Sequence, residues 1–167
     1  MPEKETVFSS KIKSTGIFSF KDFYKFCYDW LKDEMGMDIS EKKYEEKIKG
    51  DSKDIEVRWS GEKAVTDYFK FEVEVTLVVD GLTAVEITED GVKVSTNKGG
   101  IGVDVKGTLV RDYDGKFEMS AFKKFMRGMY EKWVIPSRVE EYKGKLGSQC
   151  DEFLSQAKAY LDLEGKR

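Results

Sequence analysis

The residues that carry reactive side chains limit the chemistry open to this chain. It contains no histidine and two cysteines, Cys27 and Cys150. Without histidine, a Ser-His-Asp triad, a Cys-His pair and a metal site with imidazole ligands are excluded. Both cysteines fall on apolar helical stripes, which favours buried, reduced thiols over a disulfide. An enzyme would have to work with carboxylates, lysine, tyrosine or cysteine, and we expect no catalytic residues, no metal and no cofactor.

Two short segments have the composition of ligand-binding loops. The segment 99–102 reads Gly-Gly-Ile-Gly and the segment 111–115 reads Arg-Asp-Tyr-Asp-Gly. Phosphate-binding glycine loops lie between a strand and a helix, whereas strand pattern flanks 99–102 on both sides. A calcium loop needs more alternating oxygen ligands and a distal glutamate than 111–115 supplies. We therefore interpret both segments as hairpin turns.

Carboxylates alternate with apolar residues in the segment 64–79, where Lys70, Glu72 and Glu74 occupy one set of alternate positions. Paired carboxylates act as acid and base where a cleft raises the pKa of one of them. Nothing in the sequence places these in a cleft. We favour cross-strand ion pairs on a solvated face of a sheet.

Composition and charge indicate one globular domain spanning residues 1–167. Basic and acidic residues number 29 and 32 and are well mixed, giving a net charge of −3. No basic run stands out, which argues against a surface for nucleic acid. The N-terminus has no apolar run, and no segment approaches the roughly 18 apolar residues of a membrane span. We expect a cytoplasmic protein with no transmembrane segment.

Alternating hydrophobicity predicts an antiparallel sheet of about six to seven strands. The strongest pattern lies at 64–79, where every second residue from Phe69 to Val79 is apolar. Such an asymmetry between two faces is typical of antiparallel sheets. An edge strand is expected within 7–18, and Gly107 is expected to mark a bulge or bend. Turns are predicted within 37–44 and at 50–52, 60–62, 80–81, 90–91, 97–100 and 114–115.

Helical patterns flank the strands and complete an α+β class. One helix is expected at 19–35, capped by Ser19 and ended by Gly36. A long C-terminal helix is expected from Ser120 onward, kinked near Pro136 because an interior proline loses a hydrogen bond and clashes with the preceding turn.

This order of elements resembles the helix-grip fold of the START-like and Bet v1-like superfamily over about residues 7–163. The resemblance rests on the strand at 64–79, on the Asp-Gly turns at 80–81, 90–91 and 114–115, and on the helix after Ser120. Members of the superfamily curve a sheet around a long C-terminal helix and commonly bind apolar ligands in the cavity between them. The resemblance implies such a cavity here. A helix-flanked open sheet without a cavity is the alternative.

Three functions stay open. The favoured one is a non-catalytic binding domain that holds an apolar small molecule or lipid between sheet and C-terminal helix. Its cavity is expected to be lined by Phe69, Phe71, Val73, Val75, Met126, Met129 and Trp133. The alternative is a protein-interaction or self-assembly module, with a homo-oligomer or another protein as partner. It would use the long C-terminal helix and a second apolar face of the first helix, formed by Phe26, Tyr28 and Trp30, although burial between layers also explains that face. The third is an enzyme of unknown type without histidine chemistry.

Overall fold

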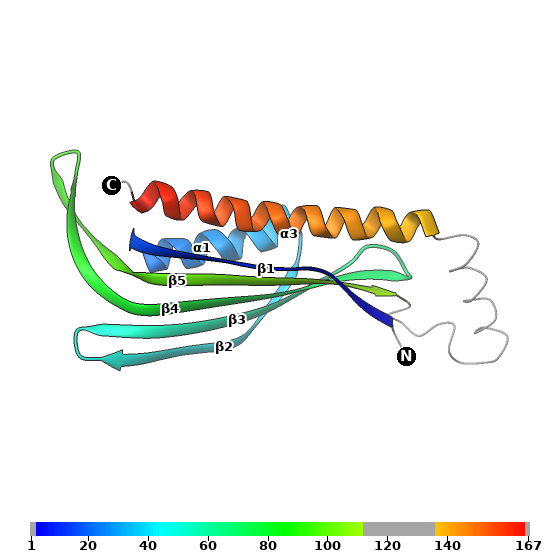
Figure 1. Ribbon diagram of the computed structural model, residues 1–167, viewed down its shortest axis with the longest axis horizontal. Coiled ribbons are helices and arrows are strands. Elements are labelled where there is room, and N and C mark those ends of the chain that lie inside the picture. Colours follow the sequence, from blue (N-terminus) through cyan, green and yellow to red (C-terminus); the bar gives the residue numbers. More distant parts are fainter. Residues whose placement is uncertain (1–2, 112–135, 166–167) are drawn as a thin grey trace.

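A computed structural model of the chain describes residues 3–111 and 136–165 (Figure 1). The described elements, in chain order, are β1 (Glu3–Phe18), α1 (Phe20–Asp29), a π-helical turn η1 (Trp30–Glu34), β2 (Asp38–Lys49), β3 (Ser52–Ala64), β4 (Phe69–Glu89), β5 (Val92–Arg111) and α3 (Pro136–Gly165). The strands form one antiparallel sheet in the order β1-β5-β4-β3-β2. The predicted α+β class, the antiparallel sheet and the edge position of the first strand are confirmed.

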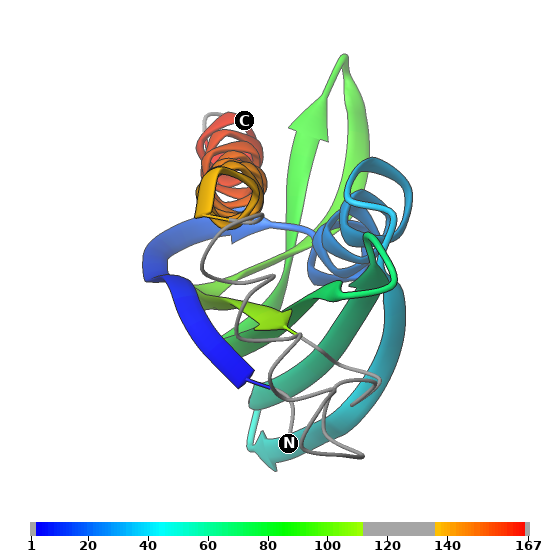
Figure 2. The ribbon, with the colours of Figure 1, turned by 90° about the vertical axis from the view of Figure 1, so that its right-hand side faces the viewer.

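Both described helices cover the same face of the sheet, which we call the inner face (Figure 2). The long α3 runs over β1 and β5, and α1 lies over the half of the sheet that contains β3. The far end of the β4–β5 hairpin bends toward the helical side (Figure 1). The hydrophobic core lies between the sheet and the two helices.

The alternation in β4 fixes which side of this strand faces the helices. Every second side chain from Phe69 to Val79 is buried, and each is at most 2% exposed. Burial of one such side chain stabilises the fold by about 1.5–3 kcal/mol. A slip of one residue would expose all of them at a cost on the order of 10 kcal/mol, comparable with the whole stability of a domain. The register of β4 is therefore strongly determined.

Four predicted turns are wrong, because the chain continues through them as strand. Residues 38–44 lie inside β2, 60–62 inside β3, 80–81 inside β4 and 97–100 inside β5. At Asp80 the register of β4 against β5 shifts, and Gly81 takes a positive φ of 62° there, so the Asp-Gly pair marks a bulge. Gly99 lies against this bulge, where an added β-carbon would come within 3.0 Å of the Leu82 α-carbon. These glycines let the two strand backbones approach closely. Because the predicted turns lie inside strands, the described strands are fewer and longer than predicted.

Two other predicted turns are confirmed as hairpin connections. Asp90 and Gly91 join β4 to β5 with φ of 52° and 79°, a pair of positive values that two-residue hairpins favour. Gly50 has a φ of 63° in the connection between β2 and β3. The turn predicted at 114–115 lies outside the described residues.

The first helix begins and ends where its capping residues predict. The Ser19 hydroxyl accepts a hydrogen bond from the Asp22 backbone N–H at 3.3 Å, and Gly36 follows the helical segment with a φ of 68°. The described part of the C-terminal helix begins at Pro136, the position of the expected kink, and continues to Gly165. The helix expected at 120–135 lies outside the described residues. Within residues 3–111 and 136–165, no helix has both the length and the apolar character needed to cross a membrane.

One acidic side chain ties α3 to the edge of the sheet. Glu5 of β1 accepts hydrogen bonds from Arg111 of β5 at 2.7 Å and from Lys143 of α3 at 2.9 Å. These contacts lower the pKa of Glu5. The hydrogen bond from Lys143 is the largest cause, burial opposes it, and Arg111 adds to the lowering.

Candidate functional site

The four described residues of the expected cavity lie side by side on the inner face of β4. Phe69 and Phe71 place their rings 5.0 and 6.3 Å from the ring of Tyr142 on α3. Val73 and Val75 border a gap that is too small to hold a water molecule, with a volume of about 0 Å³ for a water-sized sphere. This part of the interface between sheet and helices is filled by protein side chains. The other three expected lining residues, Met126, Met129 and Trp133, lie outside the described residues.

The three interaction candidates on the first helical segment pack against rings of the same chain. Phe26 stacks on Tyr160 of α3 with ring centroids 4.8 Å apart, and Trp30 lies 5.5 Å from Phe153 of α3.

Tyr28 lies 5.7 Å from Trp59 of β3. The two apolar faces of the helix thus contact the sheet on one side and α3 on the other. Burial between layers explains the aromatic excess of this helix.

A hollow opens beside the start of α1, between the β2–β3 hairpin and the bulged part of β4 and β5. It has a volume of about 270 Å³, and we call it the α1 pocket. Its lining consists of Phe20, Lys21, Tyr24, Tyr44, Glu46, Lys53, Ile55, Leu82 and Asn97. Ile55 and Leu82 are buried core residues. The pocket therefore joins an apolar base to a polar rim.

Aromatic rings form one wall of the α1 pocket. The ring of Tyr24 lies 6.1 Å from those of Phe20 and Tyr44, and it meets Tyr44 edge to face at 79°. Behind Tyr24, the buried Trp59 packs against it at 5.1 Å. Edge-to-face pairs at these separations contribute about 0.5–1.5 kcal/mol each beyond burial, so this wall has a defined shape.

Carboxylates hold the tyrosine hydroxyls of the pocket. The Tyr24 hydroxyl donates to Glu41 Oε1 at 2.5 Å, and Trp59 Nε1 donates to the same oxygen at 3.3 Å. The Tyr44 hydroxyl donates to Glu46 Oε1 at 2.8 Å.

Burial, followed by these hydrogen bonds to glutamate, raises the pKa of both Tyr24 and Tyr44 to about 12. Both side chains are therefore neutral phenols at neutral pH. Their hydroxyl protons are committed to the glutamates and are not free to donate to a ligand.

Larger hollows exist but lack this aromatic wall. A groove of about 370 Å³ crosses the outer face of the sheet at Gly100 and Gly102, and its sides carry Lys11, Lys13 and Asp104. Another hollow, of about 510 Å³, lies beside Gly36, Met37, Asp38, Glu62, Lys63, Ala64 and Lys70. Ligand sites are usually lined by apolar and aromatic side chains with a few placed polar groups. The outer groove also has the apolar residues Ile12, Val78, Ile101 and Val103 in its lining, but of these three hollows only the α1 pocket is lined by aromatic side chains.

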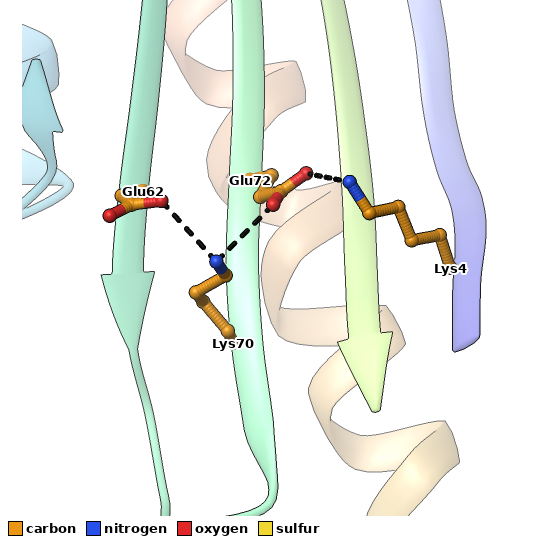
Figure 3. A network of polar contacts seen from close by, with 4 residues as sticks. All are labelled: Lys4, Glu62, Lys70 and Glu72. Atoms are coloured by element: carbon orange, nitrogen blue, oxygen red, sulfur yellow. Dashed lines mark hydrogen bonds and ion pairs between the residues drawn. The ribbon is translucent and has the colours of Figure 1, made fainter. Parts of the chain in front are cut away.

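Glu62 and Glu72 on the outer face of the sheet are engaged in ion pairs (Figure 3). Glu72 lies 3.3 Å from Lys4 and 3.4 Å from Lys70, and Lys70 lies 3.3 Å from Glu62. Burial alone would lower the pKa of Lys70, but the hydrogen bonds and charges of Glu62 and Glu72 outweigh it and raise that pKa. The pairs Glu72–Lys4 and Lys70–Glu62 join different strands, as the favoured interpretation requires, whereas Lys70 and Glu72 both lie in β4. They explain the charges of these residues without a catalytic cleft.

Both cysteines are free and buried, as the sequence predicts. Burial raises the pKa of Cys27, and it raises the pKa of Cys150 to about 12. Neither thiol is poised to act as a nucleophile, because the thiolate is the reactive form. Among the described residues, no three or more histidine, cysteine, aspartate or glutamate side chains lie together in a group that could hold a metal ion.

The sequence reasoning missed the α1 pocket. One signal was present: Tyr44 is an aromatic residue in an otherwise charged segment, and it is 49% exposed. Its neighbours Leu82 and Asn97 come from a part of the chain where turns had been predicted. No protein-family model matches the chain, and no curated protein matches it with significance.

Proposed function

We propose that this protein is a small-molecule binding domain and that the α1 pocket takes a ligand with a flat apolar body. The observation that carries the proposal is the wall of three rings, Phe20, Tyr24 and Tyr44, around a hollow of about 270 Å³. Flat apolar groups stack on such rings and gain from leaving water. The base formed by Ile55 and Leu82 extends the apolar contact.

The volume supports a small ligand. The α1 pocket has a volume of about 270 Å³. Drug-sized ligands occupy sites of about 300–1,000 Å³. A one-ring or two-ring compound suits the α1 pocket better than a lipid or a steroid.

The proposal keeps the binding function favoured from the sequence and moves its site. The filled packing around Val73 and Val75 leaves less reason to place a ligand between β4 and the first helical segment, and the rings of Phe69 and Phe71 already contact Tyr142 of α3. Proteins with the helix-grip fold have an antiparallel sheet with a C-terminal helix lying along it. The sheet and α3 of this chain have that arrangement, which supports the proposed resemblance.

Native mass spectrometry of the full chain, purified without denaturation, tests the proposal together with a ligand-observed NMR screen of one-ring and two-ring fragments. Tyr44→Ala removes one of the three rings of the aromatic wall. Ile48→Ala is the matched control, because Ile48 lies on the same strand, is 78% exposed and is not a lining residue.

We expect one small ligand, retained or captured from the screen, on the wild type and on Ile48→Ala. Tyr44→Ala should weaken its binding at least tenfold. Equal binding by all three proteins would place the ligand elsewhere. Failure of the wild type to retain or capture any fragment would contradict the proposed function.

A further inference from the structure

We infer that the ligand of the α1 pocket is an anion, namely a small aromatic or apolar carboxylate. This inference rests on the proposed function and adds the chemical class of the ligand. The argument for an anion comes from the charges and hydrogen-bond donors of the lining that have no partner in the described part of the chain.

The charges of the lining do not balance. Lys21 and Lys53 carry one positive charge each and Glu46 carries one negative charge, so the lining has a net charge of 2 − 1 = +1. Lys53 Nζ lies 3.4 Å from Glu46 Oε1, which pairs these two residues. Lys21 makes no ion pair or hydrogen bond with any other part of the described chain. The charge of Lys21 is therefore left without a partner within the lining, and Glu41, a carboxylate that contacts the wall from outside the lining, accepts hydrogen bonds from Tyr24 and Trp59.

The free hydrogen-bonding capacity of the rim also suits an anion. Asn97 Oδ1 accepts the backbone N–H of Phe20 at 3.1 Å, so the group that its amide still offers is the NH₂ donor. Glu46 Oε1 already receives the Tyr44 hydroxyl at 2.8 Å as well as the contact from Lys53. The donors left over are those of Lys21, the amide NH₂ of Asn97 and the N–H groups of Lys53 that do not point at Glu46. A carboxylate supplies two acceptor oxygens that would accept hydrogen bonds from these donors.

A cationic ligand is the competing class, because aromatic faces attract cations. Here a ligand ammonium group would have to displace Lys53 from Glu46 and would meet the unpaired charge of Lys21. The repulsion between like charges opposes the attraction of the ring faces for a cation, so the balance favours the anion.

Three probes of one shape test the inference: 2-naphthoate, the neutral 2-naphthamide and the cationic 2-naphthylmethylammonium. Their dissociation constants are measured by ligand-observed NMR against the full chain. We expect 2-naphthoate to bind about tenfold more tightly than the amide, as a charge-assisted hydrogen bond allows, and the ammonium compound to bind most weakly.

Lys21→Gln should bring the affinity for 2-naphthoate close to that for the amide and leave the affinity for the amide unchanged. Lys25→Gln is the matched control. Lys25 lies one turn further along the same helix, pairs with Asp29 at 2.6 Å and is not a lining residue. This control should bind all three probes as the wild type does.

The outcomes separate the two proposals. Equal affinity for the naphthoate and the amide, with no effect of Lys21→Gln, would overturn the anionic class and leave the proposed function standing. Tightest binding of the ammonium compound would overturn it in the same way. If none of the three probes binds, the pocket does not accept a flat apolar body, and both proposals fail.

Discussion

Gly107 of β5 lies so close to Cys150 of α3 that a β-carbon at position 107 would sit 2.9 Å from the Cys150 sulfur. The same β-carbon would lie 3.4 Å from Leu146 Cγ. Cys150 and Leu146 are fully buried. The missing side chain at 107 is what allows α3 to approach the sheet at this point. The bulge expected at Gly107 lies in the partner strand, because the register of β1 against β5 shifts between Thr6 and Phe8, and Phe8 is the residue that pairs with Gly107.

Gly107→Ala should therefore lower the free energy of unfolding by about 1–3 kcal/mol, the usual cost of overpacking a core. Urea denaturation followed by circular dichroism measures it. Cys150→Ala removes the sulfur, so the double variant should be more stable than the sum of the single effects by more than about 0.5 kcal/mol. Strict additivity would contradict the contact.

Gly144 offers the opposite case on the same helix. It is exposed in α3, and an added β-carbon would meet nothing within 4 Å. Gly144→Ala should raise the free energy of unfolding by about 0.4–1 kcal/mol, because alanine loses less backbone entropy on entering a helix. The same denaturation experiment applies, and a loss of stability would show that the backbone at 144 is not in an ordinary helical environment.

The Glu5 contacts predict a specific dependence of stability on pH. Because the folded-state pKa of Glu5 is lowered from its ordinary 4.5, its contribution is present above that pH and is lost as the pH falls through the lowered value. Glu5→Gln should cost less than about 1 kcal/mol at neutral pH, because the Glu5 side chain is 38% exposed and solvent screens it. The difference from the wild type should shrink below pH 4.5.

Glu152→Gln is the control for this prediction, since it removes an exposed carboxylate from α3 without touching the Glu5 contacts. Thermal unfolding of both variants across the acidic range provides the comparison. If the two variants show the same pH profile, Glu5 does not tie α3 to the sheet.

The tyrosines of the α1 pocket should lose their hydroxyl protons at a higher pH than ordinary tyrosines do. Tyr24 and Tyr44 have pKa values raised from 10.0 to about 12, first by burial and then by their glutamate partners. The folded state thus holds these protons more tightly than the unfolded state, so their contribution to stability is complete below pH 10 and is lost as the pH rises toward 12. Alkaline difference absorbance of the folded protein should lose its latest component in Tyr24→Phe and in Tyr44→Phe. Loss of a component near pH 10 instead would show that these hydroxyls face water.

Much of the fold follows from local pattern, and the exceptions have a common cause. The inner face of β4 and the ends of α1 were predictable because each depends on neighbouring residues. The Asp-Gly pairs at 80–81 and 90–91 look alike in sequence, yet one is a bulge within β4 and the other a hairpin. What separates them is the partner strand: Asp54 of β3 accepts the backbone N–H of Gly81 at 2.9 Å. That contact is long-range and leaves no local signal.

The α1 pocket escaped prediction for the same reason. Its lining comes from α1, from both strands of the β2–β3 hairpin and from the bulged region of β4 and β5. The aromatic residues that the sequence singled out, such as Phe26 and Trp30, pack against α3. Tyr44, which is half exposed beside the pocket, gave a weaker pattern because it stands alone among charged residues.

A titration of methyl-labelled and ¹⁵N-labelled protein with 2-naphthoate, followed by two-dimensional NMR, tests the central claim most directly. We predict that shifts concentrate on the methyl groups of Ile55 and Leu82 and on the Asn97 side-chain amide. The methyl groups of Ile48 and Val92, which are 78% and 63% exposed and outside the lining, should stay in place. Shifts centred on Val73 and Val75 would instead place the ligand between sheet and helices, and they would contradict the assignment of binding to the α1 pocket.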